Sequence, residues 1–209
     1  MIQESNVTIK NIVFDFGGVV MDWDPRYYYR DYFQDDEKME WFLENITTNA
    51  WNVEQDRGRA LEEATQILVA QYPEWEKEIR GYYGNWTTML KGDIPQNVEV
   101  LRALSNTHYE LFGLTNWSAE TIPYAYENYD FFQLFEGKIV VSGDEKLIKP
   151  DPEIWNVLLE RYQIKAQESV FIDDNQKNIE VAQSLGFKTV HILPETDLRA
   201  ELEQLGITF

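Results

Sequence analysis

The stretch FDFGGVVMDWDP, residues 14–25, decides the fold because it joins the end of a strand to the start of a helix. An apolar run leads into Asp15 and glycines follow at once, a pattern typical of a buried strand that ends in a tight ligand-binding loop. Further on, Asp24 and Pro25 match an N-cap followed by proline at the first helical position. The stretch therefore predicts a helical insertion placed directly after the first strand of a sheet.

Composition and charge narrow the class of protein. The chain has 209 residues, enough for one hydrophobic core and a smaller second unit, and a formal net charge of −19. Such a charge disfavours nucleic acid and anionic membranes as partners, and any anionic substrate then requires a local positive group. The absence of cysteine excludes disulfides, thiolate nucleophiles and zinc–thiolate sites, and it is typical of a reducing compartment.

The start of the chain, MIQESNVTIK, has neither the basic residues nor the apolar centre of a signal peptide. No apolar stretch of the sequence approaches the ~20 residues that cross a bilayer. We therefore expect a cytoplasmic protein, and the sequence carries no signal for its oligomeric state.

Five short runs predict the strands of one sheet. They are rich in Val, Ile, Leu and Phe and lack the alternation of a half-exposed sheet, so we expect both faces to be buried. The runs cover residues 10–15, 110–115, 138–142, 169–173 and 188–192. Helical patterns follow the later runs, at residues 151–162, 175–186 and 196–206. Strands that alternate with helices favour an α/β fold with a parallel sheet covered on both faces.

Residues 25–91 differ from the rest of the chain. They show helical periodicity without a convincing strand and contain many tyrosines and tryptophans. These aromatic side chains are most simply the core of an all-helical insertion, where rings pack against one another rather than line a substrate site.

Polar and charged residues gather where the predicted strands end, which is where open α/β sheets bind their ligands. Taken singly, each has an ordinary explanation as a turn residue, an N-cap or a solvated charge. Together they form a coherent set, because clustered carboxylates need a compensating cation and Mg²⁺ prefers hard oxygen ligands. The set comprises Asp15, Thr115, Lys149, Asp173 and Asp174.

Four segments in this order carry a family resemblance: VFDFGGVV, LTNWS, LIKPD and VFIDDN. With their spacing, they resemble the motifs of the haloacid dehalogenase-like hydrolase superfamily over nearly the whole chain. The resemblance implies a Rossmann-like parallel-sheet core, residues 1–22 and 92–209, with an all-helical cap inserted at residues 23–91. The opening also looks like the Asp-x-Gly-Gly or Asp-x-Gly-Asn loop of a bacterial subgroup that includes sugar-phosphate phosphatases.

By this resemblance, Asp15 is the nucleophile and forms an aspartyl-phosphate intermediate. Thr115 and Lys149 complete the catalytic set by binding the phosphoryl group, with Asn116 and Gly18 as substrate-binding residues beside them. A loop of glycines fits that role, since backbone N–H groups can approach an anion where no side chain intervenes.

The resemblance also implies a Mg²⁺ site. Asp15 and Asp174 are expected to bind the ion directly, Asp173 to act mostly through a metal-bound water, and the main-chain carbonyl of Gly17 to supply a further ligand. The expected activity is Mg²⁺-dependent hydrolysis of a small phosphorylated metabolite, such as a sugar phosphate.

Gly17 departs from the family pattern, because most phosphatases of the superfamily have a second aspartate there as general acid and base. Three interpretations stay open: a phosphatase that works without this acid, a 2-haloacid dehalogenase that uses Asp15 without metal, and a weakly active or non-catalytic protein that binds phosphate compounds. The paired Asp173 and Asp174 favour the phosphatase, since the other two have little use for a full metal set. A loop that requires positive φ would be one reason for glycine at position 17.

Other polar residues have candidate roles. Asp22 lies at the hinge into the cap and could replace the missing acid, whereas Asp24 is better explained as an N-cap. His108 and His191 lie beside or within strand patterns and are expected to be structural.

The segment WNVEQDRGR, residues 51–59, lies between helical patterns of the cap. By the same resemblance, the cap loop that faces the core selects the substrate, so Gln55, Asp56 and Arg57 are specificity candidates, with Arg57 expected to bind the substrate. Trp117 follows the second motif into the crevice and is expected to narrow it.

Overall fold

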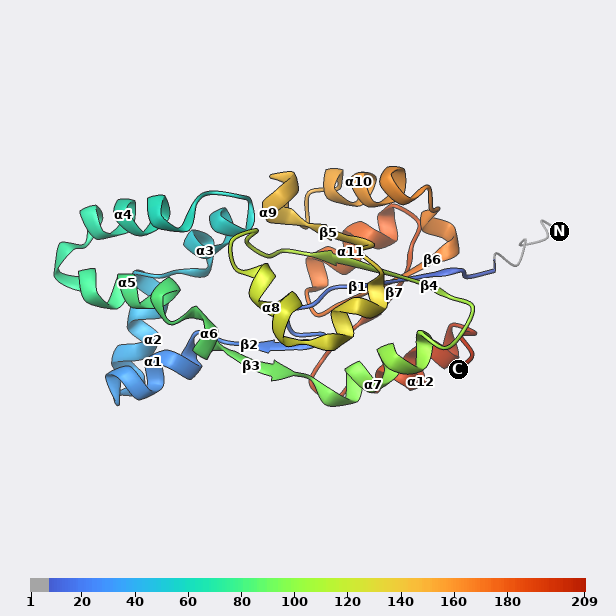
Figure 1. The fold of residues 1–209 in the computed structure, drawn as a ribbon, viewed down its shortest axis with the longest axis horizontal. Helices are drawn as coiled ribbons and strands as arrows, with labels where there is room; N and C mark the ends of the chain where they lie inside the picture. Colours follow the sequence, from blue (N-terminus) through green and yellow to red (C-terminus); the bar gives the residue numbers. More distant parts are fainter. Residues whose placement is uncertain (1–7) are drawn as a thin grey trace.

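The computed structural model describes residues 8–209 of the chain. At its centre lies a five-stranded parallel sheet with the strand order β5-β4-β1-β6-β7 (Figure 1). The strands are β1 (Asn11–Phe14), β4 (Glu110–Thr115), β5 (Ile139–Val141), β6 (Ser169–Asp173) and β7 (Lys188–His191). The predicted strands are therefore confirmed, and with them the α/β fold built on a Rossmann-like sheet.

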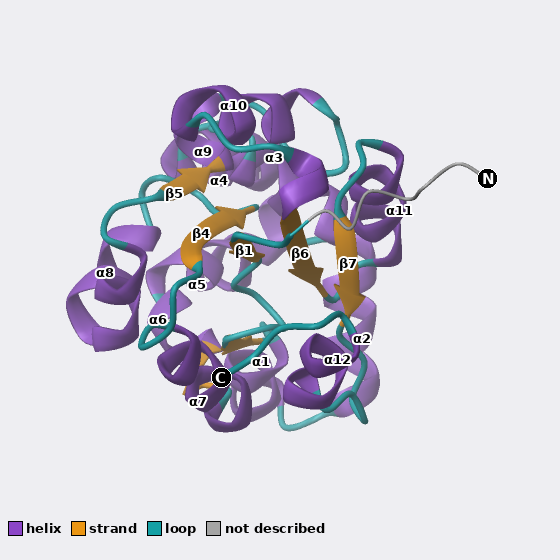
Figure 2. Ribbon diagram, turned by 90° about the vertical axis from the view of Figure 1, so that its right-hand side faces the viewer, coloured by secondary structure: helices purple, strands orange, loops and turns teal. Residues whose placement is uncertain are grey.

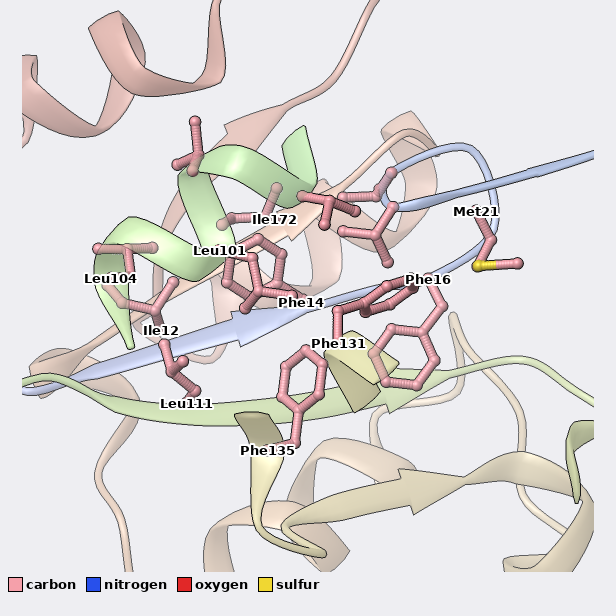
Figure 3. Close-up of a cluster of buried hydrophobic side chains, with 14 of the residues drawn as sticks. Ile12, Phe14, Phe16, Met21, Leu101, Leu104, Leu111, Phe131, Phe135 and Ile172 are labelled. Carbon is pink, nitrogen blue, oxygen red and sulfur yellow. The ribbon is translucent and has the colours of Figure 1, made fainter. Parts of the chain in front are cut away.

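Helices cover both faces of this sheet, which explains why its strands read as unbroken apolar runs (Figure 2). On β1, Val13 belongs to the hydrophobic cluster of one face, whereas Ile12 and Phe14 belong to the cluster of the other face, which Figure 3 shows in close-up. The covering helices are α7 (Pro95–Leu104), α8 (Ile122–Asn128), α10 (Glu153–Tyr162), α11 (Gln176–Ser184) and α12 (Leu198–Gln204).

The helices after the later strands agree with the sequence patterns except at two of their starts. Helix α10 begins at Glu153 rather than at Asp151, without a side-chain cap. Helix α11 is capped by Asn175, as predicted, because the side chain of Asn175 accepts a hydrogen bond from a backbone N–H of the first turn. Helix α12 begins at Leu198 rather than at Thr196, since the carboxylate of Asp197 caps it there. The predicted start of the last helix was therefore wrong by two residues.

The inserted segment is helical and has its own aromatic core, as predicted. Tyr29 and Phe42 lie at its centre with ring centroids 5.0 Å apart, and both are fully buried. Trp86 differs from the other rings, because it packs against Trp117 of the sheet region at a centroid distance of 6.0 Å. The inserted helices are α1 (Arg26–Phe33), α2 (Asp36–Asn45), α3 (Asn49–Asp56), α4 (Leu61–Gln71), α5 (Glu76–Gly84) and α6 (Trp86–Met89).

A small antiparallel pair of strands joins the insertion to the sheet region, and the sequence patterns missed it. Strands β2 (Met21–Trp23) and β3 (Leu90–Asp93) pair with each other, so the two ends of the insertion lie side by side (Figure 1). Residues 25–91, which were expected to contain no strand, therefore end within strand β3. The boundaries drawn at residues 22/23 and 91/92 fall within these strands, and the division into two domains there stays a prediction.

Short elements complete the described chain. They are η1 (Pro73–Trp75), η2 (Asp130–Phe135), α9 (Ser142–Glu145) and η3 (Ala166–Glu168). Within residues 8–209, no helix combines the length and the apolar character that a membrane crossing requires.

Candidate active site

The carboxyl ends of the central strands bring the predicted carboxylates together. Asp15 directly follows β1, and Asp173 ends the neighbouring strand β6, with Asp174 next to it. Parallel strands present their carboxyl ends at one edge of the sheet, which is why residues about 160 positions apart in the chain meet here. One oxygen from each of the three carboxylates lies within 4.8 Å of the others. This cluster is a suitable set of hard oxygen ligands for a divalent cation.

Lys149 places a buried positive charge inside the carboxylate cluster. Its Nζ lies 2.9 Å from Oδ2 of Asp15 and 2.6 Å from Oδ2 of Asp173, and its side chain is fully buried. Asn116 holds the lysine in place, because its Oδ1 accepts from the N–H of Lys149 and its Nδ2 donates to the carbonyl of Lys149, both at 2.9 Å. The side chain of Asn116 therefore positions Lys149, and it also lines the cavity described below.

Asp173 is the most firmly fixed member of the cluster. Besides Lys149, it accepts hydrogen bonds from the backbone N–H of Asn175 at 2.8 Å and from Nδ2 of Asn178 at 3.0 Å to each of its oxygens. It is fully buried, whereas Asp174 is exposed. The carboxylate of Asp173 is therefore held by more protein contacts than that of Asp174 and is less free to rearrange around a ligand.

Electrostatics in the cluster call for a compensating charge beyond Lys149. Burial raises the pKa of Asp15 to about 8, Lys149 opposes this shift, and the nearby Asp173 and Asp174 add to it. Burial also raises the pKa of Asp174. A divalent cation among these carboxylates would lower their pKa values and keep Asp15 ionised.

The two glycines after Asp15 have different reasons to be there. Gly18 has a φ of +69°, and a Cβ at this position would lie 2.2 Å from Oδ2 of Asp174, so only glycine fits. Gly17 lies outside the left-handed region, and a Cβ there would meet no atom within 4 Å. A demand for positive φ at position 17 is therefore the wrong explanation, because the backbone and the space both admit a side chain.

Thr115 supplies a hydroxyl with nothing to bind among residues 8–209. Its Oγ1 is buried at the end of β4 and has no hydrogen-bond partner in this part of the chain. A buried hydroxyl without a partner is costly, so its presence favours a ligand that accepts a hydrogen bond there. A phosphoryl oxygen between Thr115 and Lys149 would meet that need.

A cavity of about 130 Å³ lies beside the carboxylate cluster. Its lining alternates amide, carboxyl and hydroxyl groups with tryptophan rings, so it suits a ligand with both polar and apolar parts. The sheet region contributes Gly17, Asn116, Trp117, Ser118 and Thr121, strand β2 contributes Met21 and Trp23, and the insertion contributes Asn49, Asn52, Asp56, Tyr83 and Trp86. The ligand site therefore lies between the edge of the sheet and the inserted helices.

Some residues predicted to bind substrate lie elsewhere. Arg57 is not in the cavity lining, because its guanidinium pairs with Asp151 of the sheet region at 3.0 Å. Gln55 is buried inside the insertion, and Gly18 packs against Asp174 rather than facing the cavity. Trp117 does line the cavity, as expected. The assignment of Arg57 to the substrate is corrected accordingly: it connects the insertion to the sheet region.

Asp22 is also directed away from the cavity. Both of its carboxylate oxygens accept from the hydroxyl of Tyr27, at 2.8 and 3.0 Å, and Asp22 is not among the lining residues. Asp24 serves as expected at a helix start, where its Oδ1 accepts from the N–H of Arg26 at 2.8 Å. Asp22 is therefore a poor substitute for the acid missing at position 17.

The histidines have different positions with respect to the site. His191 lies at the end of β7 and its Nε2 is 2.9 Å from the carbonyl oxygen of Asp174, so it supports the backbone of the cluster. His108 is exposed and stacks beside Tyr109, with ring centroids 4.2 Å apart. Both contacts fit the structural roles expected of them.

Sequence reasoning named Asp56 of helix α3 as a specificity candidate but missed Asn49 and Asn52, which lie on the same polar face. Asn49, Asn52 and Asp56 are spaced three and four residues apart, so they share one face of the helix, and all three line the cavity. This spacing was readable in the sequence. Its meaning was hidden, because only the packing of the insertion on the sheet region turns that face toward the carboxylate cluster.

Three contacts hold helix α3 and the following loop against the sheet region. The Oγ of Ser142 donates to the carbonyl of Asp56, Arg57 pairs with Asp151, and a carboxylate oxygen of Glu120 accepts from the N–H of Leu61 at 2.9 Å. The insertion therefore lies closed over the cavity.

Comparison with known proteins places these features in context. The family description "Haloacid dehalogenase-like hydrolase" matches residues 12–192. The sesquiterpene phosphatase of Aspergillus oryzae is 27% identical over 199 residues, which cover 95% of this chain and 97% of that protein. The D-ribitol-5-phosphate phosphatase of Bacteroides thetaiotaomicron is 26% identical over 212 residues, which cover 93% and 97%. A solved HAD family enzyme from Bacteroides thetaiotaomicron, in complex with magnesium, shares the fold with a TM-score of 0.71 at 22% identity, covering 93% of this chain and 98% of that one.

Proposed function

The chain belongs to the haloacid dehalogenase-like hydrolase family and is a hydrolase, and on that premise we propose that it is a Mg²⁺-dependent phosphatase of small phosphomonoesters. The observation that carries the proposal is the buried Lys149 between Asp15 and Asp173, with Asp174 completing the carboxylate cluster. A nucleophilic carboxylate, a fixed cation and a set of oxygen ligands are the groups that phosphoryl transfer to an aspartate requires.

In the proposed reaction, an oxygen of Asp15 attacks phosphorus and the alcohol leaves, which gives an aspartyl-phosphate that water then hydrolyses. Lys149 binds the phosphoryl oxygens from one side, and the hydroxyl of Thr115, which has no hydrogen-bond partner within residues 8–209, donates to them from the end of β4. Asn116 keeps Lys149 in position through its two backbone contacts. These residues orient the group and stabilise the charge that develops on it.

The residues of the cluster fit Mg²⁺. Asp15, Asp174 and the carbonyl of Gly17 would hold the ion, with Asp173 acting through a bound water. Bound there, the ion neutralises the negative charge of the carboxylates and of the phosphoryl group. The absence of a side chain at Gly18 matters for this site, since a Cβ would displace the carboxylate of Asp174.

The substrate we propose is small and phosphorylated, such as a sugar or sugar-alcohol phosphate. The D-ribitol-5-phosphate phosphatase supports a polyol, and the amides and hydroxyls of the lining would bind one. The cavity of about 130 Å³ also limits size, because an engineered cavity of ~150 Å³ admits about one benzene ring. A leaving group much larger than a six-membered ring would require the insertion to open.

An activity screen tests this proposal. We would measure phosphate release from sugar phosphates and acyl phosphates and chloride release from 2-haloacids, each with Mg²⁺ and with a chelator. The expected result is phosphate release that stops on chelation. Chloride release in the presence of the chelator would instead establish a dehalogenase that uses Asp15 without metal. Phosphate binding without any turnover would establish a non-catalytic binding protein.

A further inference from the structure

Asp56, a specificity candidate from the sequence, is a carboxyl group of the cavity that has no part in the reaction proposed above. It lies at the end of α3 and lines the same cavity as Gly17, which lies two residues after Asp15 in the loop of the nucleophile. Among residues 8–209 it takes part in no ion pair. A carboxyl that is neither paired nor freely solvated is unusual and is typical of a functional group.

A network of hydrogen bonds within the insertion orients this carboxyl. Nδ2 of Asn52 donates to Oδ2 of Asp56 at 3.3 Å, and the hydroxyl of Tyr83 donates to Oδ1 of Asn52 at 2.9 Å. Nε2 of Gln55 contacts the Tyr83 hydroxyl at 3.0 Å, and Nε of Arg59 donates to Oε1 of Gln55 at 2.8 Å. Among residues 8–209 the network leaves the other carboxyl oxygen of Asp56 without a side-chain hydrogen bond.

The backbone of Asp56 is fixed to the sheet region as well. Ser142 donates its hydroxyl to the carbonyl of Asp56, and the same oxygen of Ser142 accepts from the N–H of Trp117 at 2.9 Å. Trp117 follows the strand that carries Thr115. The position of Asp56 is therefore set relative to the phosphoryl-binding residues whenever the insertion is closed.

The protonation of Asp56 suits proton transfer near neutral pH. Burial raises its pKa to about 7, and a hydrogen bond from the backbone of Ser118 opposes the shift. Around it, Tyr82 and Tyr83 of α5 are neutral because burial also raises their pKa values, while the guanidinium groups of Arg57 and Arg59 are turned to Asp151 and Gln55.

The space beside Gly17 completes the argument. The second aspartate of the family would start from this position, where a Cβ would meet no atom of residues 8–209 within 4 Å, and Gly17 lines the same cavity as Asp56. We propose that Asp56, reaching into this cavity from the insertion, is the general acid and base that replaces the aspartate missing at position 17. This inference rests on the proposed phosphatase function.

The proton balance of the proposed step is as follows. As the bond from Asp15 to phosphorus forms and the bond from phosphorus to the leaving oxygen breaks, the carboxyl of Asp56 gives its proton to that oxygen. The resulting carboxylate of Asp56 then takes a proton from water as the water oxygen attacks phosphorus. The Asp15–phosphate bond breaks, which releases inorganic phosphate and restores the carboxylate of Asp15 and the carboxyl of Asp56.

The dependence of rate on the leaving group tests this role. We would measure kcat/KM and pre-steady-state phosphate release for the wild type and Asp56→Asn on aryl and alkyl phosphates of graded leaving-group pKa. The variant is expected to lose ~10²–10⁴-fold on alkyl phosphates and less than ~3-fold on 2,4-dinitrophenyl phosphate, because a good leaving group needs no proton. A loss of equal size across the series would overturn the inference, since a merely structural residue would produce it.

Two further variants sharpen the result. Gly17→Asp in the Asp56→Asn background is expected to recover at least ~10-fold of the lost rate on alkyl phosphates, because position 17 admits a side chain. No recovery in a variant that folds would count against a shared role of the two positions. Glu54→Gln, an exposed carboxylate change on the same helix, is the matched control and is expected to leave the whole series unchanged.

The outcomes separate this inference from the proposed function. If the wild type hydrolyses phosphomonoesters with Mg²⁺ but Asp56→Asn leaves the leaving-group dependence unaltered, the phosphatase stands and the role of Asp56 is refuted. If the wild type hydrolyses no phosphomonoester, even 2,4-dinitrophenyl phosphate, the proposed function fails and takes this inference with it.

Discussion

The cavity has two sides of different character, the strand-end side and the insertion side. On the strand-end side, Lys149 and Asp173 are fully buried and joined by direct contacts, the shorter of them 2.6 Å. On the insertion side, Asp56 is held through neutral side chains, and its link to Asn52 is 3.3 Å long. In the reaction that we propose, this difference is a division of labour. The charges that would act on the phosphoryl group are fixed in the sheet region, while the groups that would meet the leaving alcohol lie on helices that contact the sheet region through a few bonds.

The largest effect should come from the strand-end side. Asp15→Asn is expected to lower kcat on the order of 10⁴-fold or more, because a carboxamide keeps the shape but is a poor nucleophile. The fold and phosphate binding should persist, as measured by circular dichroism and calorimetry. Near-normal turnover by this variant would show that Asp15 is not the nucleophile, and the contrast between the two sides would lose its chemical basis.

The metal side of the cluster should show a smaller and recoverable effect. Asp174→Ala is expected to weaken the Mg²⁺ affinity at least ~10–100-fold, since one oxygen ligand is lost while the buried Asp173 stays in place. A titration of activity against Mg²⁺ would check this, with part of the rate returning at high metal concentration. If saturating Mg²⁺ recovers nothing, Asp174 does more than hold the ion.

The two glycines provide a matched pair on the border between the sides. Gly18→Ala should lower the free energy of unfolding by ~1–2 kcal/mol and weaken Mg²⁺ binding, because of its φ of +69° and the contact of a Cβ with Asp174. Gly17→Ala should change the free energy of unfolding by less than ~0.5 kcal/mol. Urea unfolding and Mg²⁺ titration of both variants would test this, and equal losses would refute the difference that we assign to the two positions.

The smallest effect is expected at the ion pair of Arg57 with Asp151, which connects the insertion to the sheet region. Arg57→Ala should cost ~0.2–1 kcal/mol of stability, because its ion pair with Asp151 is partly exposed to solvent. Its effect on KM should be reproduced by Asp151→Ala and should shrink in high salt. A large rise in KM for Arg57→Ala alone would restore the direct contact with substrate that the sequence suggested.

The strand-end side was predictable because each strand can be recognised from its own short segment of sequence. Each buried strand reads as an apolar run, and the carboxyl ends of parallel strands share one edge, so Asp15, Thr115 and Asp173 had to lie near one another. Strands β2 and β3 escaped prediction because they are short, and the segment LKGD of β3 carries only one apolar residue. Such strands depend on their pairing partner rather than on their own sequence.

The insertion side was predictable only in part, because it depends on how helices dock: Asp56 was a candidate, whereas Asn49 and Asn52 were not. Polar residues of a surface segment can face solvent, a neighbouring loop or a ligand, and the sequence of residues 51–59 is compatible with each. Arg57 and Asp56 are adjacent in the chain, yet one pairs with Asp151 outside the cavity and the other lines it. The turn that ends α3 separates them, and neighbours in sequence do not report on such a change of direction.

The pairing of β2 with β3 has a consequence for the evolution of such enzymes. Because Met21 pairs with Asp93, the inserted segment leaves and re-enters the sheet region at almost the same point, and the sheet is unaffected by the length of chain between them. A lineage can therefore exchange the helices that meet the leaving group while it inherits the nucleophile and its charges intact. If Asp56 acts as we propose, an aspartate at position 17 is dispensable in a chain whose inserted segment carries a carboxyl of its own.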